Sequence, residues 1–334
     1  METKQQPWLA CYIYHGEPWE SLLKDHVGPI AHSILADGLA EQFFFIRYWE
    51  RGPHIRLRFK GDRRRMEATI RPRLNQYFER YFSDNPSNRE EPEGVASLPE
   101  DKQWFPNDSL QYIEYEPELS RYGGPVGLEI SERQFQVSSD TVLAVMGDSD
   151  GWDYERAMGA AIQLHLGFAY AMGMDLPEAI SFYTRIFKLW LGRAFGYIPG
   201  MEKEEVVKRK EATMVAFAEN FEKQKEVLIP FHQAIWEAFA DNVSFEQDWL
   251  NIWLQETRRI GDQLKTAQAE GKLQFPEHFI PDPDSSVPRD RQLLWAILES
   301  YVHMTNNRLG IHNHDEAFLG HLIHQSLLHL APDG

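Results

Sequence analysis

Apolar and polar residues alternate most regularly over residues 54–60, which read HIRLRFK. Successive side chains of a β-strand point to opposite faces, so this pattern predicts a strand with Ile55, Leu57 and Phe59 facing a core. A second strand is predicted over 42–50. The Glu50-Arg51-Gly52-Pro53 segment between them has the length and composition of a hairpin turn.

The rest of the first 130 residues reads as further strands with few helices. Runs rich in aromatic and β-branched residues predict strands over 8–15, 110–116 and 126–130. Helical spacing predicts a helix over 21–35, interrupted at Gly28-Pro29, and a clearer one over 63–82 despite Pro72. The polar, proline-rich stretch 83–108 is expected to be a loop or a mobile insertion.

From residue 131 onward the hydrophobic pattern has the period of a helix. A short helix over 141–146, capped by Ser138-Ser139-Asp140, is predicted first. Longer helices are then predicted over 153–174, 176–195, 203–240, 245–270, 288–309 and 314–330. We therefore expect an α+β fold in which an N-terminal mixed or antiparallel sheet with flanking helices, residues 1–130, packs on a helical subdomain, residues 131–334, as one functional unit.

Composition narrows the class of ligand. The 334 residues include 34 basic and 51 acidic side chains, for a formal net charge of −17. A chain this acidic argues against nucleic acid as the main ligand. No stretch is long and apolar enough for a membrane-spanning helix, and the N-terminus lacks a signal-peptide core, so a cytoplasmic location is expected. The single cysteine, Cys11, excludes an intrachain disulfide and is expected to be a buried, inert thiol.

Against this acidic background, a row of cations on the 54–60 strand suggests an anion site. His54, Arg56, Arg58 and Lys60 share the face opposite the apolar residues, and Arg47 on the preceding strand is expected to extend the patch. Guanidinium groups grip a carboxylate or phosphate through two parallel hydrogen bonds. The alternative is an edge strand that its positive charge protects from aggregation.

A turn-rich segment after the 110–116 strand forms the second candidate. Glu118 and Arg121 lie three residues apart, and Gly123-Gly124 permits positive φ angles and a close approach of the backbone to a ligand. The alternative is a surface turn with an incidental ion pair.

The third candidate is a histidine on the polar side of the 288–309 helix. Glu299, His303 and Asn307 follow one another at four-residue spacing, so the first and last could orient the imidazole as an acid or base, and Gly310 is placed to end the helix. The alternative is a solvated histidine. His312, His314, His321 and His324 match none of the recognised zinc spacings, so neither a metal nor another cofactor is expected.

Taken in order, the segments Pro53–Arg58, Glu118–Gly124 and His303-Met304 with Asn307-Arg308-Leu309 resemble the small C-terminal domain of lantibiotic dehydratases, which also occurs free-standing as thiopeptide-type bacteriocin biosynthesis proteins. The likeness extends to the 8–14 and 43–49 strands and to residues 127–131, and so spans nearly the whole chain.

The resemblance implies a lyase. In that family a separate glutamylation domain esterifies Ser or Thr of a precursor peptide using glutamyl-tRNA, and the small domain eliminates glutamate to leave dehydroalanine or dehydrobutyrine. The family's elimination residues match Arg56, Arg58, Glu118, Arg121 and His303. His54, Arg47, Asn307 and Arg308 are expected to contact substrate. The sequence does not say whether His303 or Glu118 transfers the proton.

Two alternatives stay open. Relatives of the same fold form the pyridine ring of thiopeptides by a formal [4+2] cycloaddition, and a non-catalytic module could bind the precursor peptide. The expected partners are a glutamylated, ribosomally made precursor peptide and a separate glutamyl-tRNA-dependent glutamylation protein, with no direct contact to nucleic acid or membrane. The sequence leaves the formation of a homodimer open.

Overall fold

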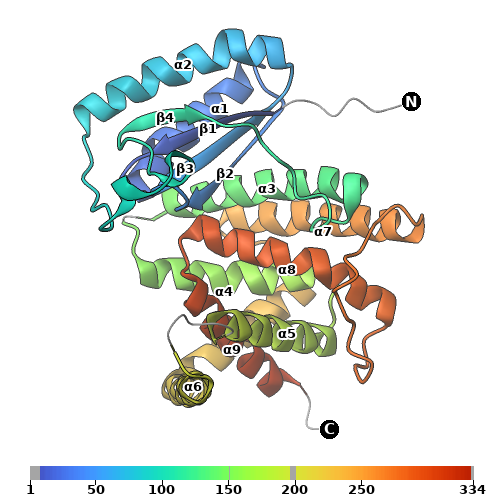
Figure 1. Ribbon diagram of the computed structural model, residues 1–334. Helices are drawn as coiled ribbons and strands as arrows, with labels where there is room; N and C mark the ends of the chain where they lie inside the picture. Colours follow the sequence, from blue (N-terminus) through green and yellow to red (C-terminus); the bar gives the residue numbers. More distant parts are fainter. Residues whose placement is uncertain (1–7, 150, 196–200, 332–334) are drawn as a thin grey trace. The chain divides into compact units, whose positions relative to one another are not determined.

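The computed structural model describes residues 8–149, 151–195 and 201–331 and confirms an α+β fold (Figure 1). The chain divides into two compact units. The sheet unit comprises Met1–Pro117 and Phe135–Trp152, and the helical unit comprises Glu118–Gln134 and Asp153–Gly334.

The sheet unit is built on four antiparallel strands in the order β2-β3-β1-β4. Their bounds are β1 Trp8–Tyr14, β2 Gln42–Tyr48, β3 His54–Lys60 and β4 Ser109–Tyr112. The strand predicted from the HIRLRFK alternation is confirmed residue for residue. The strand predicted over 110–116 is shorter than expected and ends at Tyr112.

One face of the sheet is the core of this unit. Ile55, Leu57 and Phe59 are fully buried. Helices α1 Gly28–Ala36 and α2 Arg63–Asp84 pack on the sheet, α1 against β2 and α2 against β1 and β4. The predicted interruption at Gly28-Pro29 is instead a junction: the π-helix η1, Leu22–Val27, runs directly into α1, with Pro29 in the first turn of α1.

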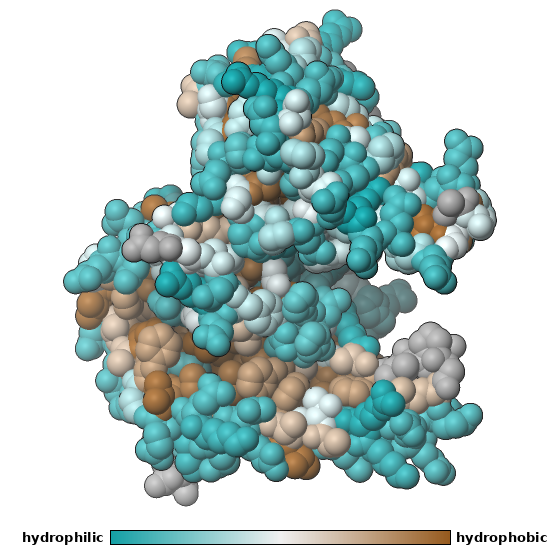
Figure 2. All heavy atoms as spheres, turned by 90° about the vertical axis from the view of Figure 1, so that its left-hand side faces the viewer, coloured by the Kyte–Doolittle hydropathy of each residue, from teal (hydrophilic) through white to brown (hydrophobic). Residues whose placement is uncertain are grey.

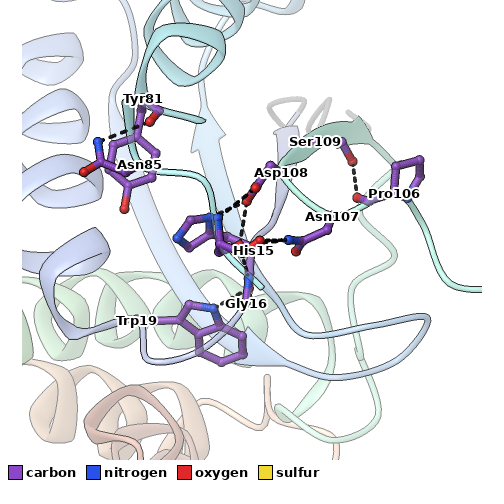
Figure 3. Close-up of polar contacts among 10 residues, drawn as sticks. His15, Gly16, Trp19, Tyr81, Asn85, Pro106, Asn107, Asp108 and Ser109 are labelled. Atoms are coloured by element: carbon purple, nitrogen blue, oxygen red, sulfur yellow. Dashed lines mark hydrogen bonds and ion pairs between the residues drawn. The ribbon is translucent and has the colours of Figure 1, made fainter. Parts of the chain in front are cut away.

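The 83–108 stretch contains only the short helices η2, Val95–Ser97, and η3, Glu100–Lys102, and is otherwise irregular. Both ends are tied to β1 by a polar cluster (Figure 3). Asp108 accepts a hydrogen bond from Ser87 Oγ at 2.6 Å, and His15 Nδ1 lies 2.7 Å from the same carboxylate oxygen. Asn107 donates to the Ser87 carbonyl oxygen at 2.8 Å. The predicted loop is confirmed, and its ends are held in place.

Helix α3, Gly124–Gly147, corrects two predictions. The strand predicted over 126–130 and the separate helix over 141–146 are both parts of α3. The Ser139 hydroxyl does not cap a helix but donates to the Phe135 carbonyl oxygen one turn back. Residues 124–134 of α3 belong to the helical unit and residues 135–147 to the sheet unit, so the predicted boundary at 130/131 falls inside this helix.

The helical unit otherwise follows the helix-period pattern closely. Helix α5 packs along α9, α4 packs against α7, and α6 packs against α9 and α4. The bounds are α4 Tyr154–Ala171, α5 Leu176–Phe195, α6 Lys203–Ala240, α7 Asp248–Ala269, α8 Arg289–Leu309 and α9 Asn313–Leu330.

On one face of the molecule the surfaces of the two units differ in polarity. On the face drawn in Figure 2 the sheet unit is mostly hydrophilic, whereas apolar side chains gather over the helical unit. Several exposed apolar side chains of the helical unit lie on α6, namely Val207, Met214, Val215, Val227 and Phe231. Among the described residues, no helix combines the length and apolar character needed to cross a membrane. Cys11 is fully buried, as expected, and burial raises the pKa of its thiol to about 12.

Candidate active site

The basic row of β3 lies on the sheet face opposite the core, as predicted. Arg56 is held on three sides: its guanidinium lies 3.6 Å from the centre of the Tyr48 ring, its Nε donates to His54 Nε2 at 3.0 Å, and its Nη2 donates to Glu50 at 3.2 Å. Its side chain retains 16% of its surface exposed. Aromatic stacking and one exposed carboxylate thus fix the direction of a cation that solvent can still reach.

Arg58 is held differently. It is only 8% exposed, and its guanidinium carbon lies 4.3 Å from the centre of the Tyr115 ring and 5.2 Å from that of Phe44. Its Nε has no hydrogen-bond partner within the described part of the chain. A largely buried guanidinium held by aromatic faces has hydrogen-bonding capacity left for an anion.

The expectation that Arg47 extends this row is wrong. Arg47 pairs with Ile55 across β2 and β3, so its side chain lies on the core face, with the row on the other side. It is 5% exposed, and its Nη1 donates to Glu20 at 2.8 Å. Arg47 therefore lies apart from the basic row and pairs within the sheet unit.

His54, expected to contact substrate, is fully buried. Its Nδ1 lies 2.8 Å from the Gly52 carbonyl oxygen, and its ring stacks on Tyr14 with centres 4.4 Å apart. Burial lowers its pKa to about 4, so the ring is neutral at pH 7. A neutral His54 that donates through Nδ1 leaves Nε2 free to accept from Arg56, and it therefore orients that guanidinium.

The turn before α3 positions Arg121 in the helical unit. Gly123 and Gly124 have φ angles of +81° and +80°, a region that side chains disfavour, as the sequence predicted. Gly127 is needed for space, because a Cβ there would lie 2.1 Å from the Tyr122 carbonyl oxygen. Arg121 Nε donates to Ser300 Oγ of α8 at 2.9 Å, and its Nη1 lies 3.3 Å from a Glu118 carboxylate oxygen.

A pocket of about 470 Å³ in the helical unit brings two of the predicted site residues together. Arg121 and His303 line it, along with the neighbouring Glu299. The remaining lining residues come from the turn, α5, α8 and the segment between α7 and α8: Ser120, Arg185, Leu189, Arg193, Pro276, His278, Phe279, Ala296 and Ser300. Three arginines and two histidines thus face one carboxylate, so the pocket is basic within a chain of net charge −17.

The single carboxylate of this lining is already paired. Glu299 accepts a short hydrogen bond from Arg185 Nε, and the Glu299 side chain is 12% exposed. Burial raises the pKa of Glu299, and Arg185 opposes that shift. Since this pair is close to neutral, the charge that a ligand would meet comes from Arg193 and from Arg121, whose charge the exposed Glu118 offsets only in part.

His303 is oriented by a residue that the sequence reasoning missed. Its Nδ1 lies 2.8 Å from Glu316 Oε1 on α9, and the Glu316 side chain is fully buried. Trp190 of α5 packs on the imidazole with ring centres 4.6 Å apart. The Arg193 guanidinium in turn lies over the Trp190 ring, 4.5 Å from its centre. Glu299, the partner expected one turn back on the same helix, is paired with Arg185 instead.

Asn307 and Arg308 are not among the residues that line this pocket. Arg308 is fully buried, and its Nη1 donates to the Met304 carbonyl oxygen one turn back. The structure thus places Arg308 inside the helical unit, outside this pocket. Gly310 ends α8 with a φ of +85°, as predicted.

Glu118 and the β3 arginines complete the set. The Glu118 side chain is 59% exposed and is not part of the pocket lining. Arg56 and Arg58 belong to the sheet unit, and their action together with Arg121 and His303 stays a prediction. The sequence reasoning missed Arg185, Arg193 and His278, because single basic residues on an amphipathic helix or in a loop resemble solvated surface positions.

Comparison with known proteins agrees with this architecture. The family model for the C-terminal region of lantibiotic biosynthesis dehydratases matches residues 8–327. The chain belongs to this family, which acts on ribosomally made precursor peptides. No curated protein sequence matches.

Three solved structures have a similar fold. The pyridine synthase TbtD from thiomuracin biosynthesis is 18% identical, with a TM-score of 0.72 and coverage of 97% of this chain and 99% of its own. TsrL is 18% identical, with a TM-score of 0.66 and coverage of 96% and 93%. The tRNA-dependent lantibiotic dehydratase MibB from Microbispora sp. 107891 is 19% identical, with a TM-score of 0.58; the match covers 98% of this chain and 28% of MibB.

Proposed function

We propose that this chain is a lyase that eliminates glutamate from glutamylated Ser or Thr of a precursor peptide, leaving dehydroalanine or dehydrobutyrine. The observation that carries the proposal is the basic pocket of the helical unit, where Arg121, Arg185 and Arg193 stand with His278 and His303 around one paired carboxylate. A glutamyl ester keeps a second carboxylate, and elimination releases a further one, so the site meets negative charge in both substrate and product.

The step balances without a cofactor. A base removes the proton from Cα of the modified residue, the electron pair forms the Cα=Cβ double bond, and the Cβ–O bond breaks to release glutamate as a carboxylate. Cations aimed at the leaving oxygen stabilise the transition state more than the ground state, and each such contact typically contributes about 3 kcal/mol.

Within this scheme Arg121 and Arg193 bind the glutamyl carboxylates, and Glu118 and Ser300 hold Arg121. His303 is the base, since it lines the pocket, whereas the exposed Glu118 is already paired with Arg121. Arg56 and Arg58 keep the substrate-clamping role that the family resemblance implies. The chain then works in the cytoplasm on the product of a separate glutamylation protein.

Cycloaddition is the second candidate, because the likeness to the pyridine synthase spans 99% of that chain. Its substrate would be a peptide with two dehydroalanines, whose reacting groups carry no carboxylate. A pocket with this excess of cations fits an anionic leaving group better than such a neutral pair.

The test is incubation of the purified chain with a synthetic peptide bearing a glutamyl ester on one Ser, without tRNA. The proposal predicts free glutamate and a peptide lighter by one glutamate. A parallel incubation with a peptide bearing two dehydroalanines distinguishes the rival enzyme, because cyclisation of that peptide without glutamate release from the first would establish cycloaddition. No change in either peptide would favour a binding module.

A further inference from the structure

The hydrogen bonds behind His303 run through four residues of the helical unit. Glu316 Oε1 lies 2.8 Å from His303 Nδ1, and Glu316 Oε2 accepts from Asn306 Nδ2 at 3.0 Å. Asn306 Oδ1 in turn lies 2.8 Å from Nε2 of His165 on α4. His165, Asn306 and Glu316 are 2%, 1% and 1% exposed, so water does not compete for these contacts.

The Glu316 carboxylate fixes the direction of these hydrogen bonds, because it can only accept and the Asn306 amide therefore turns Nδ2 toward it. Burial lowers the pKa of His165 to about 4, so its imidazole is neutral. The amide oxygen of Asn306 can only accept, so His165 Nε2 carries the proton and donates to it.

Burial raises the pKa of Glu316, and the hydrogen bonds from His303 and Asn306 oppose that shift. With Glu316 ionised, a neutral His303 has one arrangement. A carboxylate that accepts from Asn306 also accepts from His303, so the His303 proton resides on Nδ1 and its Nε2 keeps a lone pair. The His303 side chain lines the basic pocket, and its Nε2 has no hydrogen-bond partner among the described residues. Besides Glu316 on α9, Trp190 on α5 packs on the ring. The charged and titratable residues that line the same pocket are Arg121, Arg185, Arg193, His278 and Glu299.

We propose that Glu316 is the positioning residue of the active site: it holds His303 as the Nδ1–H tautomer, so that Nε2 takes the Cα proton of the glutamylated residue. This inference rests on the proposed elimination and specifies which nitrogen is the base. Asn306 donates a hydrogen bond to Glu316, and His165 holds the Asn306 amide in the orientation that allows it.

The substitution Glu316→Gln tests the proposal, because it retains the shape of the side chain but replaces one acceptor oxygen with an NH₂ group that donates. Asn306 Nδ2 still donates, so the new amide would turn its oxygen to Asn306 and its NH₂ group to His303. Nδ1 would then have to accept, and the proton would move to Nε2. Nε2 of His303 would then carry a proton and could not act as the base, while packing around position 316 would be retained.

Two measurements separate the inference from the proposed function. In protein labelled with ¹⁵N-histidine at pH 8, long-range ¹H–¹⁵N spectra report the tautomer of each ring, and the signals of His303 are those lost in His303→Gln. The wild type is expected to show Nδ1–H for His303, and Glu316→Gln is expected to show Nε2–H. An Nε2–H wild type, or an unchanged His303 tautomer in Glu316→Gln, would overturn the proposal without any activity assay.

Glutamate release is the second readout. Loss of the orienting carboxylate from a Ser-His-Asp triad lowers kcat by about 10⁴-fold. We expect Glu316→Gln to lower kcat by about 100-fold or more with KM changed less than about threefold, and Glu316→Asp to recover part of the loss. A kcat within about threefold of the wild type would contradict the proposal. If the tautomers behave as expected but no form releases glutamate, the elimination fails and the positioning stands.

Glu178→Gln is the matched control. Glu178 is also a buried glutamate of the helical unit, 8% exposed, and its carboxylate lies 2.6 Å from Arg291 Nε, but it does not line the pocket. It is expected to leave both the His303 signals and kcat unchanged. An equal loss of kcat in both variants would assign the effect of Glu316→Gln to general destabilisation.

Discussion

Arg121 and Ser300 are 179 positions apart in the chain, yet Arg121 Nε donates to Ser300 Oγ at 2.9 Å. This hydrogen bond ties the glycine-rich turn before α3 to the helix that carries His303. Together with the left-handed Gly123 and Gly124, it fixes where the guanidinium enters the basic pocket.

The Arg121 contact leads to a graded prediction. Arg121→Ala is expected to lower kcat/KM for glutamate release by about 100-fold or more, because a cation facing the leaving carboxylate is lost. Ser300→Ala is expected to cost about tenfold, as one hydrogen bond to a charged group contributes about 1.5 kcal/mol or more. Arg133→Ala is the control, since Arg133 forms an exposed pair with Glu129. Equal losses in Arg121→Ala and Arg133→Ala would contradict the assignment.

Arg47 and Arg56 provide a matched pair from neighbouring strands. Arg47→Ala is expected to lower the unfolding free energy by about 2 kcal/mol, because it removes a partly buried pair with Glu20, and to keep glutamate release within about threefold. Arg56→Ala is expected to reduce release by about 100-fold with less effect on stability. Thermal unfolding and the glutamate assay, run on both variants, check this. A larger loss of glutamate release in Arg47→Ala than in Arg56→Ala would show that the sheet face on which an arginine lies does not decide its role.

His232 on α6 is expected to make the helical unit sensitive to acid. It is fully buried, neither ring nitrogen has a hydrogen-bond partner among the described residues, and burial lowers its pKa to about 4. Between pH 6.5 and 4 the unfolded chain binds a proton that the folded chain does not, so the unfolding free energy falls as the pH falls. For this residue the loss approaches about 3 kcal/mol at pH 4.

His232→Leu is the corresponding test. Because it removes two unsatisfied polar atoms, we expect it to raise the unfolding free energy by about 1 kcal/mol at pH 7 and by more at pH 5. Urea unfolding at both pH values measures the difference. His314→Ala, at an exposed position, should change neither value. A His232→Leu variant that is less stable at pH 5 than the wild type would contradict the prediction.

The cluster of Figure 3 is expected to protect the 83–108 loop. Asp108→Ala removes the acceptor shared by Ser87 Oγ, the Ser87 backbone N–H and His15. We expect cleavage within this loop by a low concentration of protease to become about tenfold faster, because local opening loses hydrogen bonds that contribute about 1 kcal/mol each. Asp101→Ala, an exposed change in the same loop, is the control. Equal cleavage rates in both variants would show that Asp108 does not restrain the loop.

The sequence predicted elements well where one period held over a whole segment. β3 follows from the alternation of residues 54–60, and α5 follows from its helical spacing, to the residue in both cases. The start of α3 was misread because a five-residue window such as 126–130 satisfies a strand and a helix equally. Arg47 was placed on the wrong face because the register between β2 and β3 depends on the geometry of the turn.

The site was predicted only as far as local spacing reaches. Arg121 and His303 were singled out from their motifs, and the pocket brings them together. Helical spacing offered Glu299 and Asn307 as partners of His303, because positions four apart are neighbours on one helix. The actual partner, Glu316, comes from the next helix, and Arg185 comes from α5. Such contacts depend on how helices pack, which the period of a single helix does not encode.

The left-handed turn at Gly310 lies between the histidine and the glutamate that orients it. Any side chain at this position would strain the backbone and change the direction in which α9 departs. Glu316 would then hold the His303 ring in a different direction, so that its Nε2 lone pair no longer points to the substrate, in a protein that still folds. A library screened for folded protein would therefore retain such variants, whereas a library screened for product would discard them.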